Sequence, residues 1–273
     1  MGDNDLGDTA TTRSVVITGG AVGLGRAMAQ RFHALGHQVL VCSRTQRELD
    51  ALAAELPGTK VLRADVSLDT DRRALVAAAG EFGADVWINN AAIVRAHDYR
   101  SSFTLDNDRA RDELEINFAA PLELIRLFLQ HRRTAGIEGA PATIVNVNTP
   151  GALFPLEANL LYCATKAGLH LFTEALRRQL AGTQVGVVEI FPPSLDTRLA
   201  RDLEVVGQSD NGDQVIREVG DACVEGILAG TKVVLPHPAA AMMYEMFANT
   251  FEDEFIDQIN ASVQRRPGWD AEG

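Results

Sequence analysis

Cysteine, lysine and tyrosine are scarce in this 273-residue sequence, with three of each. The cysteines Cys42, Cys163 and Cys223 are too few and too far apart for a disulfide framework, and they form no CxxC pair. The six histidines show no HxH or HExxH spacing, which is the spacing that favours a zinc site. We therefore expect reduced thiols, no metal and a cytoplasmic protein.

Long apolar runs and positive charge are also missing. No apolar run reaches 18 residues, so no transmembrane helix is expected. The formal net charge is −12, and binding to phosphates or anionic membranes needs basic side chains, so we expect neither nucleic acid nor membrane as a partner. Residues 1–12 are acidic and lack the basic and apolar segments of a signal peptide, and we interpret them as a disordered tail.

What is present is an alternation of short apolar segments with longer helical ones. The apolar segments do not alternate with polar residues, which is typical of strands buried on both faces of a parallel sheet. We predict one α/β domain over residues 13–262: a Rossmann-type, doubly wound parallel sheet of about seven strands with helices on both faces. A polar, turn-rich stretch at 198–214 is predicted to act as a substrate lid, and 263–273 as a tail. The predicted strands are 14–18, 38–43, 60–66, 85–91, 143–148, 185–191 and 231–235, and the predicted helices are 23–35, 45–56, 69–82, 107–133, 159–181, 214–229 and 239–262.

A glycine-rich turn joins the first predicted strand to the first helix. It reads Thr-Gly-Gly-Ala-Val-Gly-Leu-Gly over residues 18–25. Glycine tolerates positive φ and lets the backbone approach a pyrophosphate closely, while a helix N-terminus presents free N–H groups to the phosphates. The position of this turn, in the first βα unit, predicts a dinucleotide site, although a plain tight turn remains an alternative.

The end of the second predicted strand indicates which dinucleotide is bound. NAD-binding proteins of this type place an acidic residue there for the ribose 2′-hydroxyl, whereas this chain has Ser43 and Arg44. Arg44 can pair with a 2′-phosphate and Ser43 can add a hydrogen bond. We therefore expect NADP(H) rather than NAD(H). The alternative is that Arg44 is a solvated residue at a helix start.

Tyr162 and Lys166 lie four residues apart in a helical segment, and hence on one helix face. With so few tyrosines and lysines in the chain, such a pair seldom arises by chance. A nearby ammonium lowers the pKa of a tyrosine, which would let Tyr162 act as general acid for carbonyl reduction or general base for alcohol oxidation. A surface tyrosine beside a solvated lysine is the alternative.

These motifs resemble the short-chain dehydrogenase/reductase family, which is marked by a TGxxxGxG loop and a YxxxK pair. The resemblance runs from about Ser14 to Thr197, and the run from 162 to 180 with EIFPPSLDT at 189–197 is most similar to reductases related to the DltE group. It implies hydride transfer between NADP(H) and a small-molecule carbonyl/alcohol substrate. The cofactor contacts it implies are Gly19, Ala21, Gly23, Leu24, Gly25, Ser43, Arg44, Asp65, Val66, Asn90, Ala91, Tyr162, Lys166, Pro192, Leu195 and Thr197.

Two further catalytic positions follow from the same resemblance. Asn117 matches the helix asparagine that, in the family, holds a water for proton relay near the lysine. Thr149 occupies the place of the catalytic serine, thirteen residues before Tyr162, and Ala92 stands where the family has glycine. A threonine hydroxyl can still donate to a substrate oxygen, although its methyl group crowds the pocket.

Other functions stay open at this stage. The departure at Thr149 motivates a dinucleotide-binding sensor or scaffold, and a redox-neutral epimerase or dehydratase of the same family is a further alternative. The family forms dimers through helices equivalent to 107–133 and 159–181, so a homodimer or homotetramer is implied. By composition alone, the apolar residues of these helices could equally cover the sheet.

Overall fold

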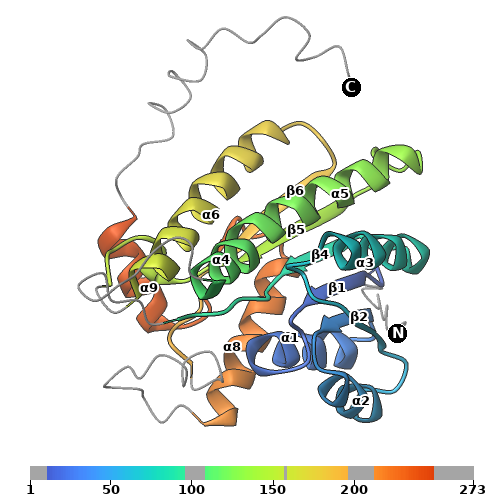
Figure 1. Ribbon diagram of the computed structural model, residues 1–273, viewed down its shortest axis with the longest axis horizontal. Coiled ribbons are helices and arrows are strands. Elements are labelled where there is room, and N and C mark those ends of the chain that lie inside the picture. Colours follow the sequence, from blue (N-terminus) through green and yellow to red (C-terminus); the bar gives the residue numbers. More distant parts are fainter. Residues whose placement is uncertain (1–10, 96–107, 157–158, 196–211, 249–273) are drawn as a thin grey trace, which may run out of the picture.

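The computed structural model describes residues 11–95, 108–156, 159–195 and 212–248. In this part of the chain strands and helices alternate from β1 to α9 (Figure 1). The strands are β1 (Ser14–Thr18), β2 (Gln38–Ser43), β3 (Lys60–Arg63), β4 (Val86–Asn89), β5 (Ala142–Val147), β6 (Val185–Ile190) and β7 (Val233–Val234). The helices are α1 (Gly23–Ala34), α2 (Gln46–Glu55), α3 (Asp69–Phe82), α4 (Asp108–Leu114), α5 (Ala120–Thr134), α6 (Leu160–Gln179), α8 (Asp213–Leu228) and α9 (Pro238–Phe247).

The seven strands form one parallel sheet in the order β3-β2-β1-β4-β5-β6-β7. Because the order reverses between β1 and β4, the carboxyl ends of these two strands flank the switch point where doubly wound sheets bind ligands. The predicted fold class is therefore confirmed.

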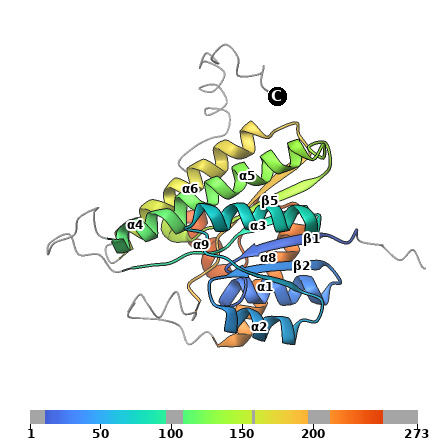
Figure 2. The same ribbon diagram turned by 45° about the vertical axis from the view of Figure 1, so that its right-hand side comes forward.

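Two apolar cores cover the two faces of the sheet, as the strand sequences require. Alternate residues point to opposite faces, so Val15 and Ile17 of β1 pack against α1, α2 and α8, while Val16 packs against α3, α5 and α6. Figure 2 shows these two helix layers on either side of the strands. Trp87, Phe32 and Phe128 are among the largest fully buried side chains.

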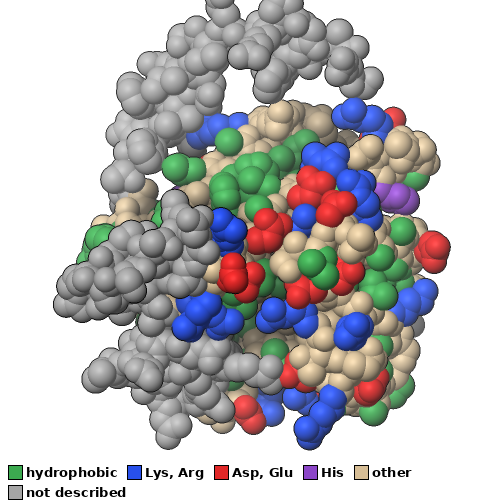
Figure 3. Space-filling model, viewed as in Figure 1, with side chains coloured by type: hydrophobic (Ala, Val, Ile, Leu, Met, Phe, Trp, Pro, Cys, Tyr) green, Lys and Arg blue, Asp and Glu red, His purple; other side chains and the backbone are tan. Residues whose placement is uncertain are grey.

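The long helices α5 and α6 pack their apolar side chains against the sheet. Ile125, Phe128 and Leu176 belong to the core beneath them, whereas Leu171 of α6 is exposed. The space-filling view shows acidic and basic side chains interspersed on one face of the molecule (Figure 3). Within the described residues, no helix combines the length and the apolar character that crossing a membrane requires.

Several predicted boundaries differ from the structure. The helix predicted over 107–133 is interrupted by a π-helical turn, Glu115–Ala119, between α4 and α5. The strands predicted at 60–66 and 231–235 shorten to β3 and β7. Residues 1–10 of the predicted N-terminal tail, the whole C-terminal tail and most of the predicted lid lie outside the described residues, as does the end of the helix predicted over 239–262.

Candidate functional site

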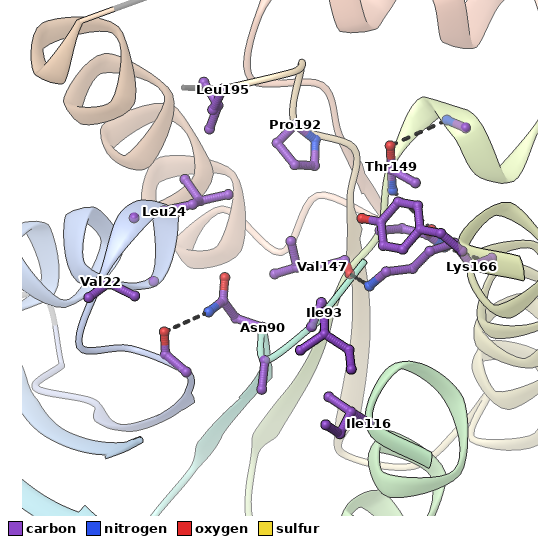
Figure 4. A pocket seen from close by; sticks show the side chains of 18 of the residues that line it. Val22, Leu24, Asn90, Ile93, Ile116, Val147, Thr149, Lys166, Pro192 and Leu195 are labelled. Carbon is purple, nitrogen blue, oxygen red and sulfur yellow. Dashed lines mark hydrogen bonds between the residues drawn. The ribbon is translucent and has the colours of Figure 1, made fainter. Parts of the chain in front are cut away.

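A cavity of about 770 Å³ lies at the carboxyl ends of the strands. It extends from the glycine turn after β1 to the start of α6, so residues far apart in the sequence face one space (Figure 4). The predicted site residues that line it are Gly19, Gly23, Leu24, Gly25, Ser43, Arg44, Asp65, Val66, Asn90, Ala91, Thr149, Tyr162, Lys166, Pro192 and Leu195. Ala21 is buried beneath the turn and Val22 lines the cavity beside it, while Thr197 lies outside the described residues.

The glycine turn is held by the segment that follows β4. The Asn90 side-chain amide donates to the Thr18 and Gly19 carbonyls at 2.9 and 3.1 Å. The Thr18 hydroxyl oxygen in turn accepts the backbone N–H groups of Asn90 and Ala91 at 2.9 and 3.0 Å. These hydrogen bonds hold the backbone of the glycine turn in one conformation.

This turn leaves no room for side chains, which is what a backbone cradle for phosphates requires. Gly19 and Gly23 have φ of +63° and +55°, a region that other residues rarely adopt. A Cβ on Gly25 would lie 2.5 Å from Asn90 Nδ2 and 2.7 Å from the Gly19 carbonyl oxygen. The residue preceding α1, Val22, makes no side-chain cap, so the first N–H groups of α1 remain available to an anion. The residues present fit a dinucleotide.

Arg44 and Asp65 meet at the end of β2. The Arg44 guanidinium lies 3.8 Å from the Asp65 carboxylate, and the Arg44 side chain is 55% exposed. Asp65 is also bound locally, because its Oδ1 accepts hydrogen bonds from the backbone N–H and hydroxyl of Ser67. A single charge pair at this distance and exposure holds the guanidinium weakly, so it is free to turn toward an anion in the cavity.

Lys166 is buried beneath Tyr162, with both side chains on one face of α6 as predicted. The Lys166 ammonium donates to the Val147 carbonyl at 2.8 Å and lies 5.8 Å from the centre of the Tyr162 ring. Burial lowers the pKa of Lys166 to about 8, and the negative charge of Glu189 opposes that shift. The ammonium form therefore still predominates at neutral pH and is lost as the pH rises through about 8.

The sequence predicted that Lys166 lowers the pKa of Tyr162, but in the structure the pKa of Tyr162 is raised. Burial raises the pKa of Tyr162, and the negative charges of Cys163 and Glu113 add to the rise. Desolvation disfavours the phenolate more than the distant ammonium favours it. Tyr162 is thus held as the phenol, which is the proton-donating form.

Thr149 begins a short 3₁₀ turn, Pro150–Ala152, at the end of β5. Its hydroxyl oxygen accepts the Gly151 N–H at 3.3 Å, which leaves the hydroxyl proton to donate elsewhere. Its backbone N–H donates to the side-chain oxygen of Asn148 at 2.9 Å. Thr149 thus faces the cavity with a fixed backbone and an available donor.

Asn117 lies in the π-helical turn and not on the cavity wall. Its side chain is fully buried and binds the backbone of Ile93 twice, accepting from N–H at 2.9 Å and donating to C=O at 2.7 Å. The amide therefore fastens the segment after β4, in which Ile93 lines the cavity. A water-holding role for Asn117 stays a prediction from the family resemblance.

Sequence reasoning missed two groups of residues. His237, Ala239 and Met243, at the start of α9, line the cavity although they follow the best-matched part of the chain. Glu189 lies fully buried in β6, and a carboxylate inside an otherwise apolar strand was the signal that could have found it. His170 of α6 binds this carboxylate.

Comparison with known proteins decides the family. Residues 13–205 match the family described as short chain dehydrogenase. The chain belongs to this family. It is 38% identical over 191 residues to "Uncharacterized oxidoreductase DltE" from Bacillus subtilis (strain 168), covering 69% of this chain and 74% of that protein. It is also 29% identical over 190 residues to human "L-xylulose reductase", with the same coverage of both chains.

The fold of solved short-chain dehydrogenases extends beyond the matched region. A "Short-chain dehydrogenase from Sphingobium yanoikuyae in complex with NADPH" superimposes with a TM-score of 0.75 at 21% identity, covering 95% of this chain and 99% of that one. At that identity the likeness shows the fold alone. The chain thus combines the short-chain dehydrogenase fold with a cavity at the switch point of its sheet.

Proposed function

We propose that the protein is an NADP(H)-dependent oxidoreductase acting on a carbonyl/alcohol pair, with Tyr162 as general acid and base. The observation that carries this proposal is that one cavity is lined both by the glycine turn at 19–25 and by Tyr162 with Lys166. A nicotinamide dinucleotide supplies the hydride when it is bound there. The chain has to supply orientation and a proton.

The side chains at the α6 end divide these tasks. The Tyr162 phenol gives the proton to the carbonyl oxygen, because burial keeps it protonated. The Lys166 ammonium stabilises the phenolate that this leaves behind. The Thr149 hydroxyl donates a hydrogen bond to the same oxygen and so orients the carbonyl.

The preference for NADP(H) rests on Arg44. This arginine lines the cavity where the β2 strand ends, and among the described residues it forms one ion pair, at 3.8 Å to Asp65. Ser43 lies next to it, and the residues preceding α2 leave the first N–H groups of that helix uncapped by a side chain. The NADPH complex of a protein with the same fold is consistent with this preference.

Paired fluorescence titrations with NADPH and NADH test the cofactor, and a panel of ketones and aldehydes tests turnover. We expect micromolar NADPH binding, weaker NADH binding, and carbonyl-dependent loss of NADPH absorbance. NADPH binding without turnover on any carbonyl would favour a dinucleotide-binding sensor. NADP(H) that stays bound through purification would favour a redox-neutral reaction. Binding of neither nucleotide would contradict the proposal.

The quaternary structure remains part of the proposal. The family resemblance implies a homodimer or homotetramer formed through α5 and α6, and Leu171 is an exposed apolar side chain on α6. Light scattering coupled to size-exclusion chromatography would distinguish these assemblies from a monomer.

A further inference from the structure

A network of buried, hydrogen-bonded polar side chains lies next to the α6 end of the cavity. It starts at the Glu189 carboxylate, which is fully buried in β6, between β5 and the edge strand β7. Glu189 Oε2 accepts a hydrogen bond from His170 Nδ1 at 2.9 Å, and Glu189 Oε1 accepts one from Asn148 Nδ2 at 2.6 Å. A carboxylate in an apolar sheet is costly unless its oxygens are paired, so this arrangement calls for a reason.

Asn148 connects this carboxylate to both sides of the site. Its Nδ2 also donates to the Lys166 carbonyl at 3.1 Å, and its Oδ1 accepts the Thr149 N–H at 2.9 Å. One side-chain amide therefore binds the backbones of the lysine and the threonine. If it turned over, its NH₂ group would meet the Thr149 N–H and its oxygen would meet Glu189, which would place donor against donor and acceptor against acceptor.

We propose that Glu189 is a positioning residue, held between His170 and Asn148, that fixes the Asn148 amide and supplies a counter-charge for Lys166. The inference rests on the proposed function, because it takes Lys166 and Thr149 as catalytic. This role explains why β6, whose other inward-facing residues are apolar, carries the charged Glu189 side chain. The negative charge of Glu189 acts on buried Lys166 against the desolvation that would otherwise discharge the ammonium.

Burial raises the pKa of Glu189, and the hydrogen bonds from His170 and Asn148 oppose that rise. The charges around His170 favour the ionised form of Glu189. They are Glu189 from β6, and Glu174 and Arg177 from α6 itself; Tyr244 of α9 packs on Phe191, which contacts the imidazole edge. Burial lowers the pKa of His170, but the Glu189 carboxylate outweighs burial and raises it. Glu174 lies in the same cluster, but its carboxylate accepts a hydrogen bond from Arg177.

The test is a direct titration of Lys166 in the cofactor-free protein. The chain has three lysines, and Lys60 and Lys232 are exposed, so ¹³C-lysine labelling gives three resonances that Lys60→Arg and Lys232→Arg assign. Glu189→Gln keeps the size of the side chain and an acceptor oxygen for Asn148, but it replaces the second oxygen with an NH₂ donor and removes the charge. We expect it to lower the Lys166 midpoint by about one pH unit.

Glu174→Gln is the matched control, because it removes a carboxylate from the same cluster without touching Asn148. It should leave the Lys166 midpoint unchanged. An unchanged midpoint in Glu189→Gln, or an equal shift in Glu174→Gln, would overturn the proposal. With a carbonyl substrate, Glu189→Gln should lower kcat about tenfold and leave the KM for NADPH unaltered.

A second measurement uses the wild-type protein and holds even if Glu189→Gln does not fold. His170, assigned with His170→Gln, should titrate above the ordinary histidine value of 6.5. A midpoint at or below 6.5 would mean that Glu189 carries no charge, and would overturn the proposal. Neither titration needs NADPH, so failure of nucleotide binding would remove the proposed function without deciding this inference.

Discussion

The two ends of the cavity differ in what they offer a ligand: one end offers backbone groups and the other offers side chains. At the glycine turn, residues 19–25, the surface offered to a ligand is backbone, and Asn90 fastens its shape. At the α6 end the surface is side chain: Tyr162, Lys166 and Thr149, held from behind by Asn148. Binding at the first end depends on room, whereas chemistry at the second depends on charge and proton position. Substitutions at the two ends should therefore fail in different ways.

Tyr162→Phe should give the largest effect and confine it to turnover. Without the hydroxyl no proton reaches the carbonyl oxygen, so kcat should fall by about 10²–10⁴-fold, while NADPH binding stays within about twofold of wild type. Steady-state kinetics and fluorescence titration measure the two separately. Tyr244→Phe, on α9, is the control and should stay active. Substantial turnover in Tyr162→Phe would refute the role given to this residue.

Gly25→Ala should impair nucleotide binding at the glycine-turn end of the cavity. The added Cβ would meet Asn90 Nδ2 at 2.5 Å and the Gly19 carbonyl at 2.7 Å, and backbone cannot yield as a flexible side chain can. We expect the NADPH Kd to rise on the order of 100-fold, about 2.7 kcal/mol. Gly139→Ala, where the Cβ meets no atom within 4 Å, is the matched control. Equal NADPH affinity in both variants would disprove the backbone cradle.

Arg44→Ala should change which nucleotide is bound rather than whether one is bound. Loss of the guanidinium should weaken NADPH about tenfold, a typical value for one charge-assisted contact to phosphate, and leave NADH unaffected. Arg47→Ala removes a neighbouring exposed arginine that does not line the cavity. If NADPH and NADH weakened together, Arg44 would have no part in discrimination.

The pH dependence of reduction should reflect Lys166. Burial lowers the pKa of Lys166 to about 8, so the ammonium is present below that pH and is lost as pH rises through it. Reduction should accordingly fall by up to about tenfold per unit above the midpoint. Lys166→Arg, which keeps its charge at these pH values, should show no such decline in whatever activity it retains. A wild-type reduction rate that does not change between pH 6 and pH 10 would contradict this assignment.

Thr149→Ser should have the smallest effect. Serine keeps the hydroxyl that accepts from Gly151 and retains a proton to donate, and it loses only the methyl group. We expect kcat/KM to change by less than about threefold. A tenfold loss would show that the threonine methyl group is itself needed to shape the pocket.

The fold was readable because local signals agreed with one another. Apolar segments without alternation predicted buried parallel strands, and the glycines at 19–25 marked the first turn. The π-helical turn at Glu115–Ala119 was not readable from local patterns. Its Asn117 amide binds the backbone of Ile93, which is 24 residues away in the sequence. The candidate site followed the same division. Its lining residues were predicted from motifs, but the contribution of α9 was not.

The sequence alone determined the family and the doubly wound sheet, because these depend on periodicity and on short motifs within single elements. Through the family resemblance it also indicated most residues that face the cavity before α9. Only the tertiary structure decided the electrostatics. Partial burial of Tyr162 at the cavity wall raises its pKa instead of lowering it, and full burial lowers the pKa of Lys166. The tertiary structure also brought Glu189 of β6 against Asn148 after β5 and His170 of α6. Desolvation and long-range pairing depend on which atoms surround a group, and neither is encoded in any one segment.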